Sequence, residues 1–151
     1  MRKRKKVYIS GALTGVNRPT SLKEFYESIG KLCEGFNMNP YVPHLNSDPV
    51  AHPDLSPKDV YEIDTREVSE SDLVIAYVGV PSLGVGSEIE IARENEVPVI
   101  LLYEKDERIS RMIRGNPTIM AEISFTDFDD ALQQLRASLE GQRFALVRPS
   151  C

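Results

Sequence analysis

One stretch of sequence decides the fold of this chain: Leu73-Val74-Ile75-Ala76-Tyr77-Val78, then Pro81-Ser82-Leu83-Gly84-Val85-Gly86-Ser87-Glu88. The first run is almost entirely apolar, which is typical of a buried strand between turn residues. The second run carries two glycines and ends in a carboxylate, and a helical pattern with Ile89, Ile91 and Ala92 follows it. The stretch therefore predicts a central strand joined to a helix by a small, glycine-bearing loop.

The loop that ends in Glu88 is a candidate ligand site, because open α/β sheets hold ligands at the carboxyl ends of their strands. Its glycines allow the backbone to approach a phosphate, and free N–H groups at a helix start attract anions. A carboxylate would repel a phosphate held by the same loop, so Glu88 indicates chemistry next to a bound nucleotide. The alternative is that Glu88 is an acid of the first helical turn, where the helix dipole favours it.

Strands and helices alternate along the rest of the chain. Strands are expected at residues 7–10, 41–42, 73–78, 97–103 and 122–125. Helices are expected at residues 20–34, at 56–70, between the glycine loop and residue 95, and at 128–139. The strands are too apolar to leave one face in water, so the pattern predicts a parallel sheet covered on both sides. The expected fold class is α/β, a single-domain three-layer sandwich with a five-stranded parallel sheet, flavodoxin-like or Rossmann-like.

The length and charge of the chain suit one domain with a full core, since it has 151 residues. We expect a basic leader at residues 1–6, a domain at 7–140 and a loosely held tail at 141–151. Basic residues run without a break from Arg2 to Lys6, yet the net charge is −5. That balance argues against a broad nucleic-acid surface.

The sequence also bears on the cellular compartment. No apolar run approaches the ~20 residues needed to cross a bilayer, and no signal-peptide pattern begins the chain. Cys33 and Cys151 are isolated thiols without metal-ligand spacing, as expected in a reducing environment. These observations predict a cytoplasmic protein that binds neither membrane nor nucleic acid.

Three groups of side chains should converge above the sheet if this topology holds. They are Tyr8 and the turn at Gly11, the acid Asp64 on the second expected helix, and the loop that ends in Glu88. Two carboxylates beside one sugar are what glycosidic cleavage requires, because one captures the developing cationic centre and the other handles the proton of the leaving group. From the residues alone, Asp64 also fits a solvated helix-face acid, and Tyr8 also fits a core position.

Four strings occur in a characteristic order along the chain: Tyr8-Ile9-Ser10-Gly11, Tyr61-Glu62-Ile63-Asp64, Pro81-Ser82-Leu83-Gly84-Val85-Gly86-Ser87-Glu88 and Ser110-Arg111-Met112-Ile113-Arg114-Gly115. Together they resemble the nucleoside 2-deoxyribosyltransferase superfamily, and most closely its 2′-deoxynucleoside 5′-phosphate N-hydrolase branch. The resemblance covers about residues 7–140, and the third string is far more specific than a lone Gly-x-Gly.

The resemblance implies a role for each matching residue. Glu88 would attack C1′ of the sugar and form a glycosyl ester, and Tyr8 would orient Glu88 by a hydrogen bond. Asp64 would assist loss of the base and then help to activate water. The residues that it implies for binding the 5′-phosphate lie in the glycine loop: Ser82, Gly84 and Gly86.

The resemblance also implies a homodimer, because Ser110 would reach the phosphate bound in the neighbouring subunit; Met112 belongs to the same string. His44, at the end of the second expected strand, could stack on the base or hydrogen-bond to it. The hydrolase branch has a serine and an arginine in the turn after the first strand, whereas Ala12 and Thr14 stand here. One phosphate contact is therefore expected to be missing.

The leading hypothesis is an enzyme that hydrolyses (deoxy)nucleoside 5′-monophosphates to free base and sugar 5-phosphate, through an ester on Glu88 that water resolves. No cluster in the sequence has metal-ligand spacing, and carboxylates and positioning suffice for this chemistry, so we expect no metal and no cofactor. One alternative is a deoxyribosyltransferase, which passes the same glycosyl group to a second base. Another is a nucleotide-binding or sensing module, which would not need Tyr8, Asp64 and Glu88 together.

Overall fold

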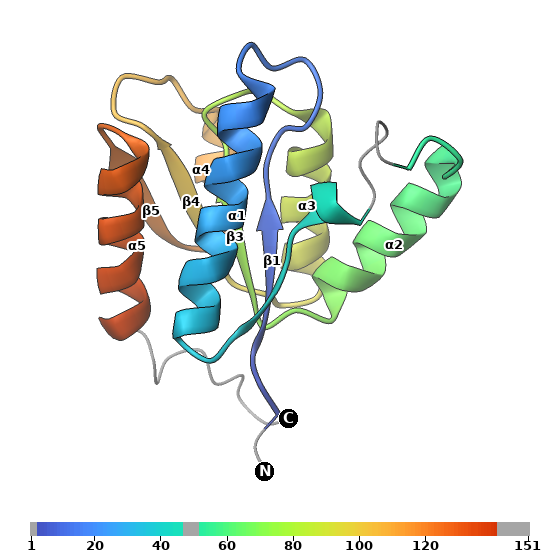
Figure 1. Cartoon of the computed structure of the whole chain (residues 1–151), viewed down its shortest axis with the longest axis horizontal. Helices are drawn as coiled ribbons and strands as arrows, with labels where there is room; N and C mark the ends of the chain where they lie inside the picture. Colours follow the sequence, from blue (N-terminus) through green and yellow to red (C-terminus); the bar gives the residue numbers. More distant parts are fainter. Residues whose placement is uncertain (1–2, 47–51, 142–151) are drawn as a thin grey trace.

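Five parallel strands form the middle layer of the structure, a computed structural model that describes residues 3–46 and 52–141 (Figure 1). Their order across the sheet is β2-β1-β3-β4-β5, and every neighbouring pair is parallel. The strands are β1 (Lys6–Ser10), β2 (Asn39–Tyr41), β3 (Leu73–Tyr77), β4 (Val99–Glu104) and β5 (Ile119–Phe125). The predicted five-stranded parallel sheet is confirmed, with strand limits that move by one to three residues.

Helices cover both faces of the sheet (Figure 1). They are α1 (Pro19–Gly35), the short 3₁₀ turn η1 (Pro43–Leu45), α2 (Pro57–Ser69), α3 (Leu83–Glu94), α4 (Arg111–Arg114) and α5 (Phe128–Gly141). Helices α1 and α5 share one hydrophobic core with one face of the sheet, and α2 and α3 share a second core with the other face. None of the helices in the described ranges is long and apolar enough to cross a bilayer.

The alternation of side chains along β1 determines which residues face α2 and α3. Val7 and Ile9 lie in the core under α1, whereas Tyr8 lies in the core under α3. Successive side chains of a strand point to opposite faces, so Ser10 projects to the same side as Tyr8. These two hydroxyl-bearing residues stand at the carboxyl end of a strand near the middle of the sheet, where parallel folds place ligands.

The start of α2 lies within one residue of the start predicted at residue 56: Ser56 caps the helix and Pro57 occupies its first turn. The Ser56 hydroxyl accepts a hydrogen bond from the N–H of Asp59 at 3.1 Å, and the Asp59 carboxylate accepts one from the N–H of Ser56 at 3.0 Å. This reciprocal capping box satisfies two N–H groups that the helix itself cannot use. It fixes the point at which the chain enters the helix that carries Asp64.

The start of α3 differs from the prediction. Ser82 is the N-cap residue, and its hydroxyl accepts a hydrogen bond from the N–H of Val85 at 3.3 Å. The helix therefore begins at Leu83, and the predicted loop as far as Glu88 is wrong, since Gly84, Gly86 and Glu88 all lie in the helix. Glycine disfavours a helix interior by roughly 0.5–1 kcal/mol per residue, but the serine cap and the buried side chains of Val85, Ile89 and Ala92 offset this.

The described part of the basic leader contacts the protein itself. Arg4 donates a hydrogen bond from Nη2 to the carbonyl of Met38 at 2.8 Å, and Lys6 forms an ion pair with Glu67 at 2.5 Å. These contacts hold the chain that enters β1 against β2 and α2. The predictions made for residues 1–2 of the leader and for residues 142–151 of the tail lie outside the described residues.

Candidate active site

The Glu88 carboxylate is held by two hydroxyl groups from β1. The Tyr8 hydroxyl donates to Oε1 at 2.9 Å, and the Ser10 hydroxyl donates to Oε2. Because Tyr8 and Ser10 are two residues apart on one strand, their side chains reach the same carboxylate from the same face of the sheet. Ser10 and Glu88 are 78 residues apart along the chain. The fold thus brings β1 against α3 so that both oxygens of this carboxylate are held.

The surroundings of Glu88 raise the pKa of its carboxyl group from 4.5 to about 7. Burial is the largest cause, because it disfavours the charged form, and the nearby charge of Asp64 acts in the same direction. The hydrogen bonds from Ser10 and Tyr8 lower the pKa and so oppose this shift. Carboxyl groups with such opposed influences are typical of active sites, where an acid must change protonation state near neutral pH.

Tyr8 is positioned as a hydrogen-bond donor. Its side chain is fully buried, and its ring stacks on that of Tyr41 with centroids 5.6 Å apart and planes inclined by 17°. Burial, followed by the charge of Glu88, raises the pKa of the Tyr8 phenol well above its ordinary value. The phenol therefore keeps its proton and points it at Glu88.

Asp64 lies on α2 and lines the same cavity as Glu88. This cavity, which we call the Glu88 cavity, has a volume of about 530 Å³. Its apolar wall comes mainly from Pro53, Leu55, Val60 and Ile91. The negative charge of Asp64 raises the pKa values of Glu88, Tyr8 and Tyr41, which places Asp64 close to all three groups. The two predicted carboxylates thus share one cavity.

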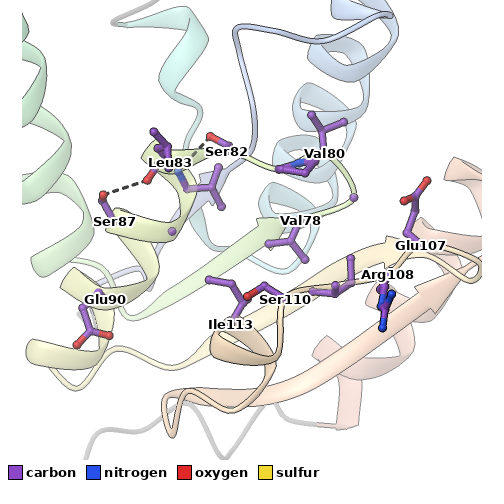
Figure 2. A pocket seen from close by; sticks show the side chains of 15 residues that line it. Val78, Val80, Ser82, Leu83, Ser87, Glu90, Glu107, Arg108, Ser110 and Ile113 are labelled. Atoms are coloured by element: carbon purple, nitrogen blue, oxygen red, sulfur yellow. Dashed lines mark hydrogen bonds between the residues drawn. The ribbon is translucent and has the colours of Figure 1, made fainter.

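A second cavity, of about 670 Å³, is lined by residues of the β3–α3 connection, of α3 and of the segment that leads into α4 (Figure 2). We call it the Ser110 cavity; its polar lining includes Ser82, Ser87 and Ser110, together with Glu90, Glu107 and Arg108. Figure 2 shows that Ser82 and Ser110 come from two elements, the start of α3 and the start of α4. Ser87 lines both cavities, so the two cavities adjoin along α3 at this residue.

The predicted binding residues divide between these places. Ser82, Gly86 and Ser110 line the Ser110 cavity, and Gly84 lines the Glu88 cavity. Gly11 is in neither lining set; instead the Tyr26 ring packs against it, and a Cβ atom there would lie 2.3 Å from Tyr26 Cζ. The glycine is needed at this point because the Tyr26 hydroxyl must pass it to donate to the carbonyl of Ala12 at 3.0 Å.

Two other predicted residues stand apart from both cavities. His44 is buried in η1, with Nε2 3.4 Å from Oε1 of Glu27 and its ring 6.3 Å from that of Tyr26. Met112 is 85% exposed on α4 and does not contribute to the lining of either cavity. The geometry thus joins the three predicted catalytic residues but leaves His44 and Met112 outside the place where they meet.

The structure also adds residues that the sequence argument did not select. Ser10 belongs to the string Tyr8-Ile9-Ser10-Gly11, but in the sequence it is a single polar residue at the end of an apolar strand. Its spacing of two residues from Tyr8 indicated that both side chains point to the same face of the sheet. Tyr61 and Thr65, four residues apart and therefore one turn apart on α2, line the Glu88 cavity together with Asp64. His52, at the end of the loop before α2, also lines the Glu88 cavity.

Comparisons with known proteins fit this geometry, although no protein-family model matches the chain. A protein of Thermofilum pendens, provisionally named 2′-deoxynucleoside 5′-phosphate N-hydrolase 1, is 31% identical over 146 residues, covering 90% of this chain and 96% of that protein. A protein of Methanosarcina mazei with the same provisional name is 30% identical over 135 residues, covering 87% of this chain and 81% of that protein.

A solved structure, that of Clostridium botulinum CMP N-glycosidase, is 25% identical and superposes with a TM-score of 0.70. The match covers 89% of this chain and all of that one. These matches extend along almost the whole chain. The same chain has the five parallel strands, the Tyr8–Glu88 contact and the cavity that Asp64 and Glu88 share. The chain belongs to the 2′-deoxynucleoside 5′-phosphate N-hydrolase family, a branch of the nucleoside 2-deoxyribosyltransferase superfamily.

Proposed function

We propose that this protein hydrolyses the N-glycosidic bond of (deoxy)nucleoside 5′-monophosphates and releases a free base and a sugar 5-phosphate. The observation that carries the proposal is the Glu88 carboxylate, which two hydroxyl donors hold in a cavity that Asp64 also lines. Two carboxyl groups at one site are what cleavage of a glycosidic bond requires. The names of the relatives, an N-hydrolase and an N-glycosidase, support the same class of reaction.

In the proposed first step, an oxygen of ionised Glu88 attacks C1′ and forms a C1′–O bond as the C1′–N bond breaks. The electron pair of the broken bond stays on the base nitrogen, and the proton that neutralises it comes from the Asp64 carboxyl group. Tyr8 and Ser10 donate to Glu88 in the ground state and so fix the direction of attack. The transition state has oxocarbenium character at C1′, which the carboxylate stabilises.

In the second step, water attacks C1′ and the ester C1′–O bond breaks, which returns the electron pair to Glu88. The Asp64 carboxylate takes one proton from the water and is ready for the next turnover. This exchange of roles follows from microscopic reversibility, since the group that gave a proton to the leaving base receives one from the incoming water.

The start of α3 suits the 5′-phosphate. The N–H groups of Leu83 and Gly84, in the first helical turn, have no acceptor within the helix, whereas the N–H groups of Val85 and Gly86 are used by Ser82. Such N–H groups, together with a serine hydroxyl and the helix dipole, bind anions. The donors are neutral, so they bind the phosphate without adding a cation beside Glu88.

The phosphate site is completed, in this proposal, by Ser110 of a second copy of the chain. Two large apolar side chains near the two serines support an interface here: Leu83 is 94% exposed and Met112 is 85% exposed. Exposed apolar residues beside an incomplete polar site are typical of surfaces that another subunit covers.

The test is chromatographic measurement of base release from ribo- and deoxyribonucleosides, with and without a 5′-phosphate. Wild type is compared with Glu88→Ala and with Glu94→Ala, a control in which an exposed acid of the same helix is removed. We expect wild type and Glu94→Ala to release base from monophosphates. Glu88→Ala should lower the rate of release by a factor of at least about 10³. A glycosyl ester on Glu88, detected by mass spectrometry of the intact protein after rapid quenching, is expected in the same samples.

Three results would contradict the proposal. Full activity in Glu88→Ala would remove Glu88 as the nucleophile. Formation of a new nucleoside when a second free base is added would indicate base exchange in place of hydrolysis. Binding of nucleotides without release from any member of the panel would indicate a binding module.

A further inference from the structure

The face of α2 that lines the Glu88 cavity carries one unusual residue, Tyr61. Its side chain is 65% exposed, although large aromatic side chains are mostly buried in folded proteins. It lines the cavity that contains Asp64 and Glu88. The aromatic ring is therefore accessible at the rim of the candidate active site, where a planar ligand could reach it.

The helix geometry places this ring next to the acid that would protonate the leaving base. Tyr61 precedes Asp64 by three residues, so the two side chains lie on one face of α2, about 4.5 Å apart along the helix axis. A nucleobase whose nitrogen lies within hydrogen-bonding distance of Asp64 would be within reach of the ring on the neighbouring turn. Tyr61 and Thr65 are four residues apart, so they also lie on neighbouring turns of one face, and both line the Glu88 cavity.

Thr65 supplies the second, independent observation. It lines the Glu88 cavity, and its hydroxyl oxygen is buried without any hydrogen-bond partner. Within the described residues, the only other buried side-chain polar atom without a partner is Nδ1 of His44, which lies away from the cavity. A buried hydroxyl without a partner is unfavourable, and such groups are expected to have a role. Threonine in a helix divides between two rotamers, so rotation about χ1 can bring this hydroxyl to the cavity surface.

We propose that this face of α2 receives the nucleobase, with Tyr61 stacking on its plane and Thr65 hydrogen-bonding to its edge. The inference rests on the proposed function, because it concerns the base of the same substrate. Stacking on an aromatic ring is tolerant of base identity, so Tyr61 provides affinity. A hydroxyl both donates and accepts, so Thr65 discriminates between bases that differ in their exocyclic amino and carbonyl groups.

The experiment for Tyr61 uses two ligands that differ only in whether they carry a base. Binding of a nucleoside 5′-monophosphate and of ribose 5-phosphate is measured by calorimetry in the Glu88→Gln background, so that no turnover interferes. Tyr61→Ala is expected to weaken the nucleotide about tenfold and to leave ribose 5-phosphate unchanged. Tyr61→Phe keeps the ring and is expected to behave as the parent. Glu62→Ala is the matched control, since that exposed neighbour lies outside the cavity lining.

Equal weakening of both ligands by Tyr61→Ala would overturn the stacking role, and so would unchanged binding of both. Failure of the proposed function looks different, because wild type would then release no base from any nucleotide. Binding to the Glu88→Gln protein would still report on Tyr61 in that case.

The experiment for Thr65 compares kcat/KM for monophosphates of the four common bases. Thr65→Val is expected to change the ratio of kcat/KM between the best and the worst base at least about fivefold. The reason is that loss of the Thr65 hydroxyl affects only those bases that hydrogen-bond to it. Thr65→Ser is expected to restore the wild-type ratio. A uniform change across all four bases in Thr65→Val would overturn the discriminating role. Thermal unfolding of Thr65→Val separates this effect from misfolding, because removal of an unsatisfied hydroxyl should not lower stability.

Discussion

At the scale of single residues, Glu88 is a buried carboxyl group held by two hydroxyl donors. Burial and Asp64 raise the pKa of its carboxyl group, and the hydroxyls of Tyr8 and Ser10 lower it, with a balance at about 7. A nucleophile must be ionised, so the rate of base release should increase as pH rises through this value. The same balance implies that each hydroxyl donor has a measurable influence on the pH dependence.

The prediction is that Tyr8→Phe moves the acidic limb of the kcat/KM profile to higher pH. Tyr8 donates to the carboxylate and stabilises its charged form, so removal of the phenol raises the pKa of Glu88. Phenylalanine keeps the stacking on Tyr41 and preserves the shape of the core. The measurement is a pH–rate profile of both proteins between pH 5 and about 9, with Ser10→Ala as a second variant expected to shift the same way. An unmoved limb, or one displaced to lower pH, would contradict this assignment.

At the scale of elements, the alternation of strands and helices could be predicted because long apolar runs and a clear serine–proline cap mark their limits. The start of α3 could not be predicted from its residues, since two glycines in four positions normally indicate a loop. The Ser82 cap and the buried face of Val85 and Ile89 decide otherwise, and neither depends on the glycines. Glu88 consequently stands in the second turn of a helix, which would hold the proposed nucleophile rigidly.

In the candidate site, the sequence predicted which residues meet but not which face of a helix lines the cavity. Tyr8, Asp64 and Glu88 could be expected to meet, because each lies near the carboxyl end of a predicted strand or on a helix that follows one. Tyr61 and Thr65 were not selected, since the sequence does not show which face of α2 is left uncovered beside α3. His44 was assigned to the base from its position in the chain, but its ring turns towards Glu27 on α1.

At the scale of the whole molecule, the proposed exchange of Ser110 between subunits can be tested by complementation. Glu88→Ala lacks the nucleophile but supplies Ser110, whereas Ser110→Ala lacks the hydroxyl but supplies Glu88. Mixed dimers of the two would contain one intact site, so mixing should restore activity on monophosphates, up to about one quarter of the wild-type value with random pairing. The assay follows base release after the two variants are unfolded together and refolded, with each variant refolded alone as the control.

Absence of any gain on mixing, while light scattering shows a dimer, would mean that Ser110 acts within its own subunit. A monomer at all concentrations would contradict the dimer itself. The Ser110 cavity, which Ser82 and Ser110 of one chain both line, would then be the whole phosphate site.

The burial of Glu88 has a consequence for the stability of the folded protein. The pKa of Glu88 is raised from 4.5 to about 7 on folding, so the native state holds this proton more tightly than the unfolded chain. The contribution of Glu88 to the free energy of unfolding should then be fully present below about pH 4.5 and should be lost as pH rises to about 7. The loss should be about 3 kcal/mol in all, since one pKa unit corresponds to about 1.4 kcal/mol.

Glu88→Gln, which cannot ionise, should lose this dependence and resist urea better than wild type at pH 8, with the difference vanishing near pH 5. An equal or lower urea midpoint for Glu88→Gln at pH 8 would contradict this. The ionised carboxylate that the proposed reaction needs is therefore a form that the fold itself disfavours: near neutral pH, the folded protein would trade part of its conformational stability for a charged carboxylate.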